Sequence, residues 1–338
     1  MTDAIEEMAR RADIGDPAAM TAIGKLALVG RAGNRTPNDG TRLLVKAAEA
    51  GNAEADAVIA VLIGADAKAI ADWELALGYL ERAAWRGWVP ARRQLALLCR
   101  DQNLAAQSAM ESPPAKIWNS MRCRVDVPAL TSVPDGRAVF EQPHVRVIEG
   151  FATPAECSWM IERARPRMAR ARVFDNDRGG SRLQGARTNS AVQFDILEAD
   201  IVLLILHARI AAATGYPTNH LEETNVLHYA AGEEFVRHHD YFDPGRPGLA
   251  KEIAEAGQRA VTFLVYLNEG FDGGETRLLK LDWQFRGRPG DALCFRNILP
   301  SGEPDVLTLH AGLPPLRGEK WLLSQWIRTR PPRRSSVA

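Results

Sequence analysis

Three residues in the second half of the chain have the side chains and the spacing of a metal site. His238 and Asp240 lie two positions apart on a segment that reads as a β-strand, so both side chains should project from one face. His310 ends a second expected strand. Two imidazoles and one carboxylate are the ligand set of non-haem Fe(II) centres, which keep coordination positions open for a co-substrate and O2. His239 should face the other way, and we exclude it as a ligand.

A lysine follows this set at a spacing that matters for the co-substrate. A 2-oxo acid can chelate such an iron through its keto oxygen and adjacent carboxylate, and its far carboxylate then needs a positive partner. Lys320, ten residues after His310 and at the start of a strand, can supply that charge. A buried ammonium without a bound anion would be unfavourable. A zinc hydrolase also uses two histidines and a carboxylate, but that alternative leaves Lys320 unexplained.

Length and composition place broad limits on the protein class. The 338 residues suggest two domains, and the 46% hydrophobic and 25% charged content is that of a globular protein. The 42 basic and 42 acidic residues cancel, so no overall charge favours nucleic acid or a membrane surface as a partner. Four widely spaced cysteines, a polar N-terminus and the lack of a long apolar run together predict a cytoplasmic protein.

Basic residues are nevertheless concentrated in two places. Eight arginines fall between Arg163 and Arg187, and residues 331–338 form a basic tail. Such a concentration is typical of a solvated surface, or of a groove for an acidic partner or substrate. The sequence leaves both interpretations open.

The first hundred residues repeat with a period of 36. Gly15, Gly51 and Gly87 are in register, and five further columns keep the same spacing: Ala12/Ala48/Ala84, Ala19/Ala55/Ala91, Met8/Leu44/Leu80, Ile23/Ile59/Leu95 and Leu26/Leu62/Leu98. Each unit reads as a helix, a turn at the glycine and a second helix, and such units stack into an α-solenoid. Residues 1–105 resemble Sel1-like repeats, relatives of tetratricopeptide repeats. The resemblance implies a surface that binds a protein or peptide, although a packing role alone is an open alternative.

The sequence pattern changes after the repeats. Residues 106–140 are rich in helix breakers and read as a linker with one short helix around residues 115–122. Within residues 141–330 we expect a strand at 145–151, helices at 153–164 and 199–214, and then short strands at 225–229, 235–240, 260–267, 276–280, 291–295, 306–310 and 320–328. The predicted fold class is α+β and multidomain, with an N-terminal α-solenoid of helix pairs followed by a double-stranded β-helix (jelly-roll) catalytic domain with flanking helices.

Residues 145–328 resemble the catalytic domain of the prolyl 4-hydroxylase family of Fe(II)/2-oxoglutarate dioxygenases. The matching segments, in order, are VIEGFATPAECSWMI, ARTNSA, LEETNVLHYAAGEEFVRHHDYF, RAVTFLVYLNEGFDGGETRL, GDALCF and LHAGLPPLRGEKWLLSQWIR. The resemblance implies that His238, Asp240 and His310 ligate Fe(II) and carry catalysis, and that Lys320 holds the distal carboxylate of 2-oxoglutarate. It also implies O2 as a co-substrate, succinate and CO2 as products, and L-ascorbate as the reductant that restores oxidised iron.

The same resemblance assigns roles to eight further residues. The co-substrate and iron pocket would be lined by Tyr229, Thr262, Tyr266 and Trp326, and the peptide substrate would meet Glu222, Arg259, Phe235 and Arg328. Phe235 stands where many members have a tyrosine, and Arg328 where some have a histidine. Both departures leave the substrate open, including whether it is proline.

The leading hypothesis is a dioxygenase that hydroxylates a peptidyl residue, proline in the first instance, on a protein that the repeats dock. One alternative is a hydroxylase of a free amino acid or small metabolite. Another, from a different class, is a repeat-based interaction protein whose oxygenase domain is idle. Repair of alkylated bases would favour arginine over lysine as the carboxylate anchor and a more basic chain, so we do not expect nucleic acid as a partner. Without a long apolar run or an overall charge, we do not expect a membrane as a partner either.

Overall fold

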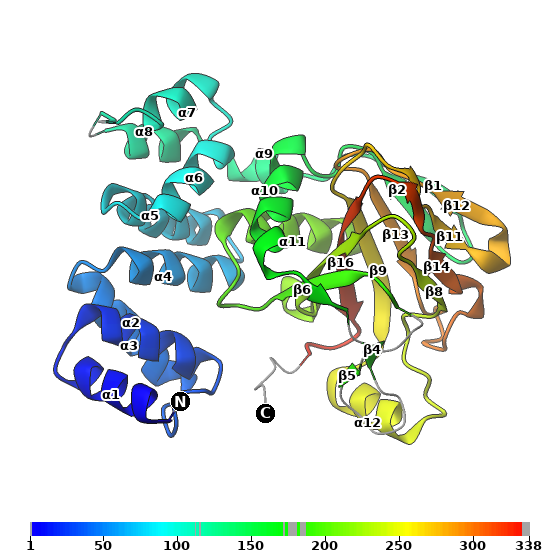
Figure 1. Cartoon of the computed structure of the whole chain (residues 1–338), viewed down its shortest axis with the longest axis horizontal. Helices are drawn as coiled ribbons and strands as arrows, with labels where there is room; N and C mark the ends of the chain where they lie inside the picture. The colour runs from blue at the N-terminus through cyan, green and yellow to red at the C-terminus, as the bar shows by residue number, and fades with distance from the viewer. Residues whose placement is uncertain are drawn as a thin grey trace. The chain divides into compact units, whose positions relative to one another are not determined.

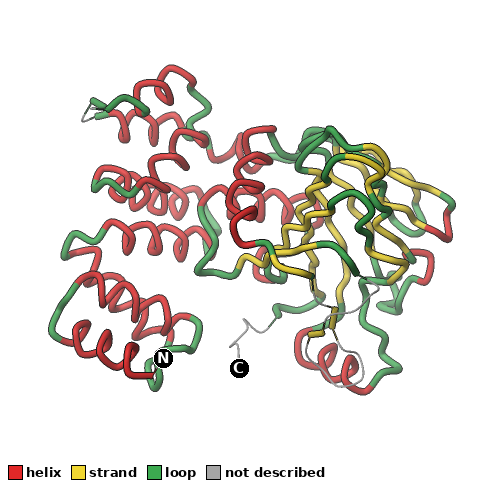
Figure 2. Tube along the Cα trace, in the orientation of Figure 1, coloured by secondary structure: helices red, strands yellow, loops and turns green. Residues whose placement is uncertain are grey.

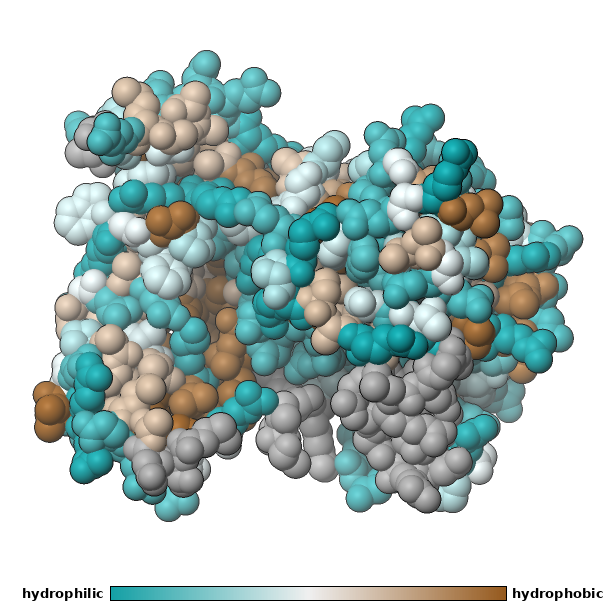
Figure 3. All heavy atoms as spheres, viewed as in Figure 1, coloured by the Kyte–Doolittle hydropathy of each residue, from teal (hydrophilic) through white to brown (hydrophobic). Residues whose placement is uncertain are grey.

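The structure is a computed structural model of the chain that describes residues 2–111, 113–114, 116–171, 173–174, 181–182 and 187–332. It divides into two compact units (Figure 1). The helical unit comprises the residues up to Ser132 together with Ile196–Leu206, and the β-rich unit comprises Val133–Asp195 and His207–Pro332. Hydrophilic residues predominate on the face of the β-rich unit that Figure 3 shows. None of the described helices has the length and apolar character that a bilayer span requires.

The helical unit is built from helices joined by short loops (Figure 2). They are α1 (Thr2–Asp13), α2 (Pro17–Leu28), α3 (Pro37–Glu49), α4 (Ala53–Ala65), α5 (Ile70–Trp85), α6 (Val89–Leu98), α7 (Gln102–Ser108), α8 (Ile117–Arg124) and α9 (Val127–Thr131). In each of three successive helix pairs, a glycine (Gly15, Gly51 or Gly87) lies between the two helices. Their φ angles of 92°, 95° and 96° lie in a region that glycine enters without steric cost. The predicted succession of helix, glycine turn and helix is confirmed.

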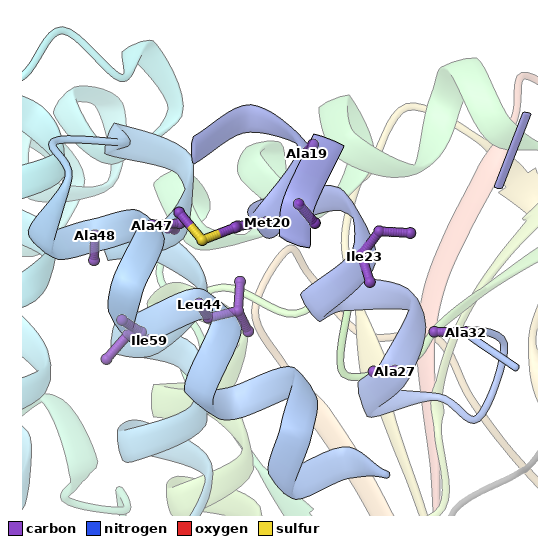
Figure 4. Close-up of a cluster of buried hydrophobic side chains, with 11 residues drawn as sticks. Ala19, Met20, Ile23, Ala27, Ala32, Leu44, Ala47, Ala48 and Ile59 are labelled. Atoms are coloured by element: carbon purple, nitrogen blue, oxygen red, sulfur yellow. The ribbon is translucent and has the colours of Figure 1, made fainter. Parts of the chain in front are cut away.

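Small residues allow these helices to approach one another closely. The buried side chains gather between neighbouring helices, with Ile23 and Leu44 fully buried (Figure 4). Where α2 meets α3, a Cβ added at Gly40 would lie 2.6 Å from the carbonyl oxygen of Gly24. A glycine is therefore required at this crossing in addition to the alanines that the repeat pattern had indicated.

The stretch expected to be a linker is more ordered than the sequence indicated. Residues 106–140 contain the end of α7, all of α8 and α9, and the strand β1, where one short helix was predicted. Ile117, Trp118 and Met121 of α8 are buried, which explains why proline and serine do not leave this segment extended.

Two antiparallel sheets form the β-rich unit. The larger has the order β1 (Gly136–Phe140), β2 (Val145–Ile148), β13 (Ala292–Arg296), β9 (Arg259–Tyr266), β16 (Lys320–Arg328), β7 (Thr224–Tyr229), β6 (Ser190–Phe194) and β3 (Ala169–Arg170). The smaller has the order β12 (Trp283–Phe285), β11 (Thr276–Leu278), β14 (His310–Gly312) and β8 (Phe235–His238). This arrangement is consistent with the jelly roll expected from the sequence.

Short elements complete this unit. Two small ladders pair β10 (Asp272–Gly273) with β15 (Pro315–Arg317) and β4 (Val173–Phe174) with β5 (Ser181–Arg182). The helices are α10 (Pro154–Ala164), α12 (Pro247–Ala256) and the single-turn 3-10 helices η1 (Arg165–Arg167), η2 (Thr218–His220), η3 (Leu279–Leu281) and η4 (Val306–Thr308). Of α11 (Ile201–Thr214), the residues from His207 onward belong to this unit. The predicted helix at 153–164 is confirmed, and Thr153 caps it by accepting a hydrogen bond from the Glu156 amide.

Two predicted strands differ from the structure near the expected metal ligands. The strand at 306–310 was wrong: Val306–Thr308 is a 3-10 helix, because the Asp305 carboxylate accepts the Leu307 amide at 2.9 Å and caps it. The strand β14 begins only at His310. The strand at 235–240 ends at His238, so Asp240 lies beyond it.

Candidate metal centre

The structure brings the three predicted ligands together. Strands β8 and β14 pair with His238 opposite His310, and Figure 1 shows the two strands side by side. The Nε2 atoms of His238 and His310 each lie 3.5 Å from an Asp240 carboxylate oxygen. One ligand atom from each residue lies within 4.8 Å of the others, and among the described residues no other group of three has this geometry. This spacing allows one metal ion to contact all three side chains.

Hydrogen bonds orient both imidazoles for metal binding. Nδ1 of His238 lies 2.8 Å from the carbonyl oxygen of Val236, and Nδ1 of His310 lies 2.9 Å from that of Thr308. Each Nδ1 therefore carries the proton, which leaves the Nε2 lone pair directed towards Asp240. Burial, with the neighbouring His238 ring, lowers the pKa of His310 to about 4, so this imidazole is neutral at pH 7.

A chain of hydrogen bonds holds the carboxylate of Asp240. Thr262 donates its hydroxyl hydrogen to Asp240 Oδ2 at 2.7 Å, and the Asn297 amide donates to the Thr262 oxygen at 2.9 Å. Burial acts to raise the pKa of Asp240, but hydrogen bonding and nearby positive charge, including that of Arg259, outweigh it and keep the pKa below its ordinary value. Asp240 is thus an ionised, oriented ligand although it lies outside a strand.

Lys320 provides a second test of the site, because its buried Nζ makes no hydrogen bond within the described part of the chain. Its side chain is 0% exposed, and among the described residues its Nζ has no hydrogen-bond partner. Nζ lies 5.0 Å and 5.3 Å from the ring centres of Tyr229 and Tyr266. Burial lowers the pKa of Lys320 to about 7. A buried ammonium of this kind fits an anionic ligand, as the distal carboxylate of 2-oxoglutarate would be.

The backbone beside Lys320 leaves room for its side chain. Gly274 has a φ of 71°, and a Cβ there would lie 2.9 Å from the Phe271 ring and 3.4 Å from Lys320 Cδ. The GGET turn at residues 273–276 therefore depends on glycine for both conformation and space.

The four residues expected to line the co-substrate and iron pocket lie in three places: two beside Lys320, one against Asp240 and one beneath Arg259. The Tyr229 side chain, 2% exposed, lies beside Lys320 on the neighbouring strand. The Tyr266 hydroxyl donates to the Phe285 carbonyl oxygen at 2.7 Å, so only its ring faces Lys320. Thr262 lies at the other end, against Asp240. The Trp326 ring packs beneath the Arg259 guanidinium at 3.7 Å and lines a surface groove together with His238 and Asp240.

An open groove of about 1030 Å³ is lined by two of the three ligands, His238 and Asp240. Phe235, expected to meet the substrate, lines this groove and stacks on His238 with ring centres 3.6 Å apart. Glu222 and Arg259 also line it, joined by two hydrogen bonds of 2.8 Å. Three of the four predicted substrate residues are therefore placed where a substrate can reach them.

Arg328 is placed differently from the prediction. Its side chain is 1% exposed and does not line the groove. The guanidinium donates to Glu222 at 3.1 Å, to the Glu252 carboxylate at 2.9 Å and to the Ala256 carbonyl oxygen at 3.1 Å. The register between β16 and β9 shifts between Ile327 and Arg328, a local feature that the sequence pattern did not reveal. Arg328 supports Glu222 from behind and does not contact the groove.

Two residues of the site, Arg187 and Asn297, were not predicted from the sequence. Arg187 is 7% exposed, lines the groove and holds its guanidinium 4.7 Å above the Phe235 ring. The motif ARTNSA, which contains it, was the available signal. Asn297, the last member of the hydrogen-bond chain to Asp240, gave no signal because it lies in a loop after β13.

Comparison with known proteins shows the family to which the chain belongs. Residues 224–328 match the 2OG-Fe(II) oxygenase superfamily. Probable prolyl 4-hydroxylase 4 of Arabidopsis thaliana is 34% identical over 212 residues, which cover 56% of this chain and 69% of that protein. The chain belongs to the prolyl 4-hydroxylase-like 2OG-Fe(II) oxygenases. It is a 2-oxoglutarate-dependent dioxygenase, a class that uses Fe(II), 2-oxoglutarate and O2.

Further relatives of this oxygenase carry related names. Prolyl 4-hydroxylase 2 of Arabidopsis thaliana is 30% identical over 233 residues, covering 62% of this chain and 76% of that protein. Among solved structures, the viral collagen prolyl hydroxylase of Paramecium Bursaria Chlorella virus-1 with 2-oxoglutarate is 25% identical, with a TM-score of 0.43, and the match covers 56% of this chain and 98% of that one.

Proposed function

We propose that this oxygenase hydroxylates a prolyl residue of a peptide substrate, with His238, Asp240 and His310 as the Fe(II) ligands and Lys320 as the anchor of 2-oxoglutarate. The observation that carries the assignment of the site is the convergence of two oriented Nε2 atoms and one ionised carboxylate. A buried ammonium in the same unit, which makes no hydrogen bond among the described residues, supports it. The bound iron would supply the oxidising chemistry, which inserts one oxygen atom into a C–H bond while 2-oxoglutarate is converted to succinate and CO2.

The protein's own residues would keep this chemistry oriented. Thr262 and Asn297 fix the Asp240 carboxylate, and the backbone carbonyls of Val236 and Thr308 fix the two imidazoles. Tyr229 and Lys320 would position the co-substrate away from the groove, so that the substrate enters from the side of Phe235 and Trp326.

The shape of the groove favours a peptide over a free amino acid or small metabolite. Its volume of about 1030 Å³ is open to the surface and reaches from β3 to α12, whereas sites for small molecules enclose most of the ligand. The names of the relatives favour proline as the residue modified. An idle oxygenase domain is disfavoured because the full ligand set is present and in hydrogen-bonded orientation.

For the helical unit we propose a Sel1-like α-solenoid that docks the substrate protein. Its helix pairs support this interpretation, because each has a glycine turn between its two helices and these turns recur every 36 residues. A groove of about 810 Å³ lies on this unit, with the apolar residues Ile5, Ala9 and Leu43 beside the basic Arg31 and Lys46. The proposal includes residues 1–105 as repeats, 106–140 as a linker, 141–330 as the catalytic domain, a cytoplasmic location, and ascorbate as the reductant.

The test is a peptide hydroxylation assay. Proline-containing peptides are incubated with the full chain, Fe(II), 2-oxoglutarate, ascorbate and O2, and mass spectrometry locates any gain of one oxygen atom. We expect oxygen on a prolyl residue in amounts that match the peptide-dependent succinate, and none with the His310→Ala variant. Succinate that forms with a free amino acid but with no peptide would favour the small-molecule alternative.

A further inference from the structure

The walls of the groove carry an excess of positive charge. Its lining residues include five arginines, Arg170, Arg187, Arg237, Arg246 and Arg259, against three carboxylates, Glu222, Asp240 and Asp243. The chain as a whole has no net charge, so this excess is local to the groove. We propose that the peptide substrate carries acidic side chains close to the hydroxylated residue and that the arginines of the groove select for them. This inference rests on the proposed function and specifies its substrate class.

The carboxylates of the groove are already engaged. Both oxygens of Glu222 accept hydrogen bonds from Arg259, and Arg328 donates to one of them from behind. Asp240 is one of the three proposed metal ligands and accepts a hydrogen bond from the Thr262 hydroxyl. Asp243 accepts the Gly245 amide and lies 3.6 Å from Arg246. Among the described residues, each carboxylate on these walls therefore already has a hydrogen-bond donor, which makes the walls less suited to a basic peptide.

Two lining arginines remain available to a ligand. Arg170 on β3 and Arg237 on β8 are both exposed, and neither has a hydrogen-bond or ion-pair partner among the residues that the structure describes. Planar guanidinium groups match carboxylates with paired hydrogen bonds, which gives geometric selection as well as attraction.

A third arginine places positive charge near the reacting centre. Arg187 is only 7% exposed, and its guanidinium covers the face of the Phe235 ring. Phe235 in turn stacks on His238. Since this face of the groove is largely excluded from water, a charge here attracts an anion more strongly than the exposed arginines do.

A nucleic acid is the other polyanion that a basic groove could attract. Nucleic-acid binding draws on many phosphate contacts along an extended basic surface. Here the arginines line a single groove of a chain without net charge, and Trp326 is covered by Arg259. The features of the groove favour a peptide with a few carboxylates.

The experiment uses matched peptides and the full chain. Three series of proline-containing peptides differ only in their flanking residues, which are Asp and Glu, the near-isosteric Asn and Gln, or Lys. Binding is measured by fluorescence anisotropy with Fe(II) and 2-oxoglutarate under anaerobic conditions, and hydroxylation is measured after O2 is added. We expect the acidic series to bind about ten-fold or more tightly than the amide series, with a preference that shrinks at high salt.

Variants of the chain identify the residues responsible. Arg170→Gln and Arg237→Gln should each reduce the preference for acidic peptides by roughly 2- to 5-fold, and Arg187→Lys should reduce it further by removing the planar group. The matched control is Arg137→Gln. Arg137 is exposed on β1, at the opposite edge of the same sheet from β3, and should leave the preference unchanged.

Each outcome separates this inference from the proposed function. Equal hydroxylation of the acidic and amide series overturns the acidic preference and leaves prolyl hydroxylation intact. Tight binding of acidic peptides without hydroxylation supports the preference and counts against proline as the target. An equal loss in the Arg137→Gln variant, or tighter binding of a single-stranded oligonucleotide than of any peptide, overturns the inference.

Discussion

Replacing Lys320 with methionine should stabilise the protein when no co-substrate is bound and abolish its response to 2-oxoglutarate. The ammonium is 0% exposed and has no hydrogen-bond partner among the described residues. Methionine is of similar length and apolar, so it removes the buried charge and leaves little empty space. Stability and ligand binding should therefore change in opposite directions.

The expected magnitude comes from the pKa of Lys320. Burial lowers this pKa to about 7 from the ordinary value of 10.5, so the folded state binds the proton more weakly than the unfolded chain does. One pKa unit corresponds to about 1.4 kcal/mol, which gives an upper limit on the order of 5 kcal/mol. The cost is fully present below pH 7, decreases as the pH rises from 7 to 10.5, and vanishes above that range. The advantage of methionine should follow the same course.

Urea denaturation between pH 6.5 and 10 measures the first effect, and a thermal shift with 2-oxoglutarate and a divalent metal measures the second. In wild type, 2-oxoglutarate at a hundred times its Kd should add about 2.7 kcal/mol of stability. Lys320→Met should show no such gain. Lys280→Met, at an exposed lysine of the same unit, should change stability by less than about 0.5 kcal/mol. A Lys320→Met protein that is less stable than wild type at pH 7 without ligand would refute the reasoning.

Three further substitutions test separate parts of the structure. Thr262→Val removes the hydrogen bond to Asp240 and should weaken Fe(II) binding about 10- to 100-fold in an anaerobic titration; unchanged affinity would mean that this bond does not orient the carboxylate. Glu156→Gln removes the carboxylate charge that lies 2.6 Å from the buried Arg209 guanidinium and should lower the free energy of unfolding by about 3–5 kcal/mol, whereas a loss below about 1 kcal/mol would contradict that account. Gly274→Ala should destabilise the protein by about 1–3 kcal/mol, because its φ is 71° and its Cβ would meet the Phe271 ring, and a neutral result in urea denaturation would speak against this.

The sequence was most informative where chemistry and periodicity restrict the residues. Repeat period and glycine positions predicted the helix pairs, because a left-handed turn between packed helices admits few residues other than glycine. The spacing of His238, Asp240 and His310 predicted a cluster that the structure does bring together, although Asp240 does not lie on the predicted strand. It lies beyond the end of β8, and its position depends on Thr262 and Asn297, which are distant in sequence.

Features set by tertiary contacts escaped prediction. The segment before His310 has the composition of a strand, but the Asp305 cap turns it into a 3-10 helix. Arg328 lies on an expected strand, yet a register shift and three acceptors draw it away from the groove. The helix α8 is stabilised by burial of its apolar side chains, which local helix breakers do not reveal.

The central claim is tested most directly by comparing variants of two adjacent histidines, His238 and His239. The measurement is the Fe(II)-dependent formation of succinate from 2-oxoglutarate. His238 is one of the three clustered residues, whereas the next residue, His239, points its Nε2 at the Val306 carbonyl oxygen, 3.3 Å away. We predict that His238→Ala loses both bound Fe(II) and succinate formation and that His239→Ala retains both. Succinate formation that survives in His238→Ala, or that is lost only in His239→Ala, would contradict the account.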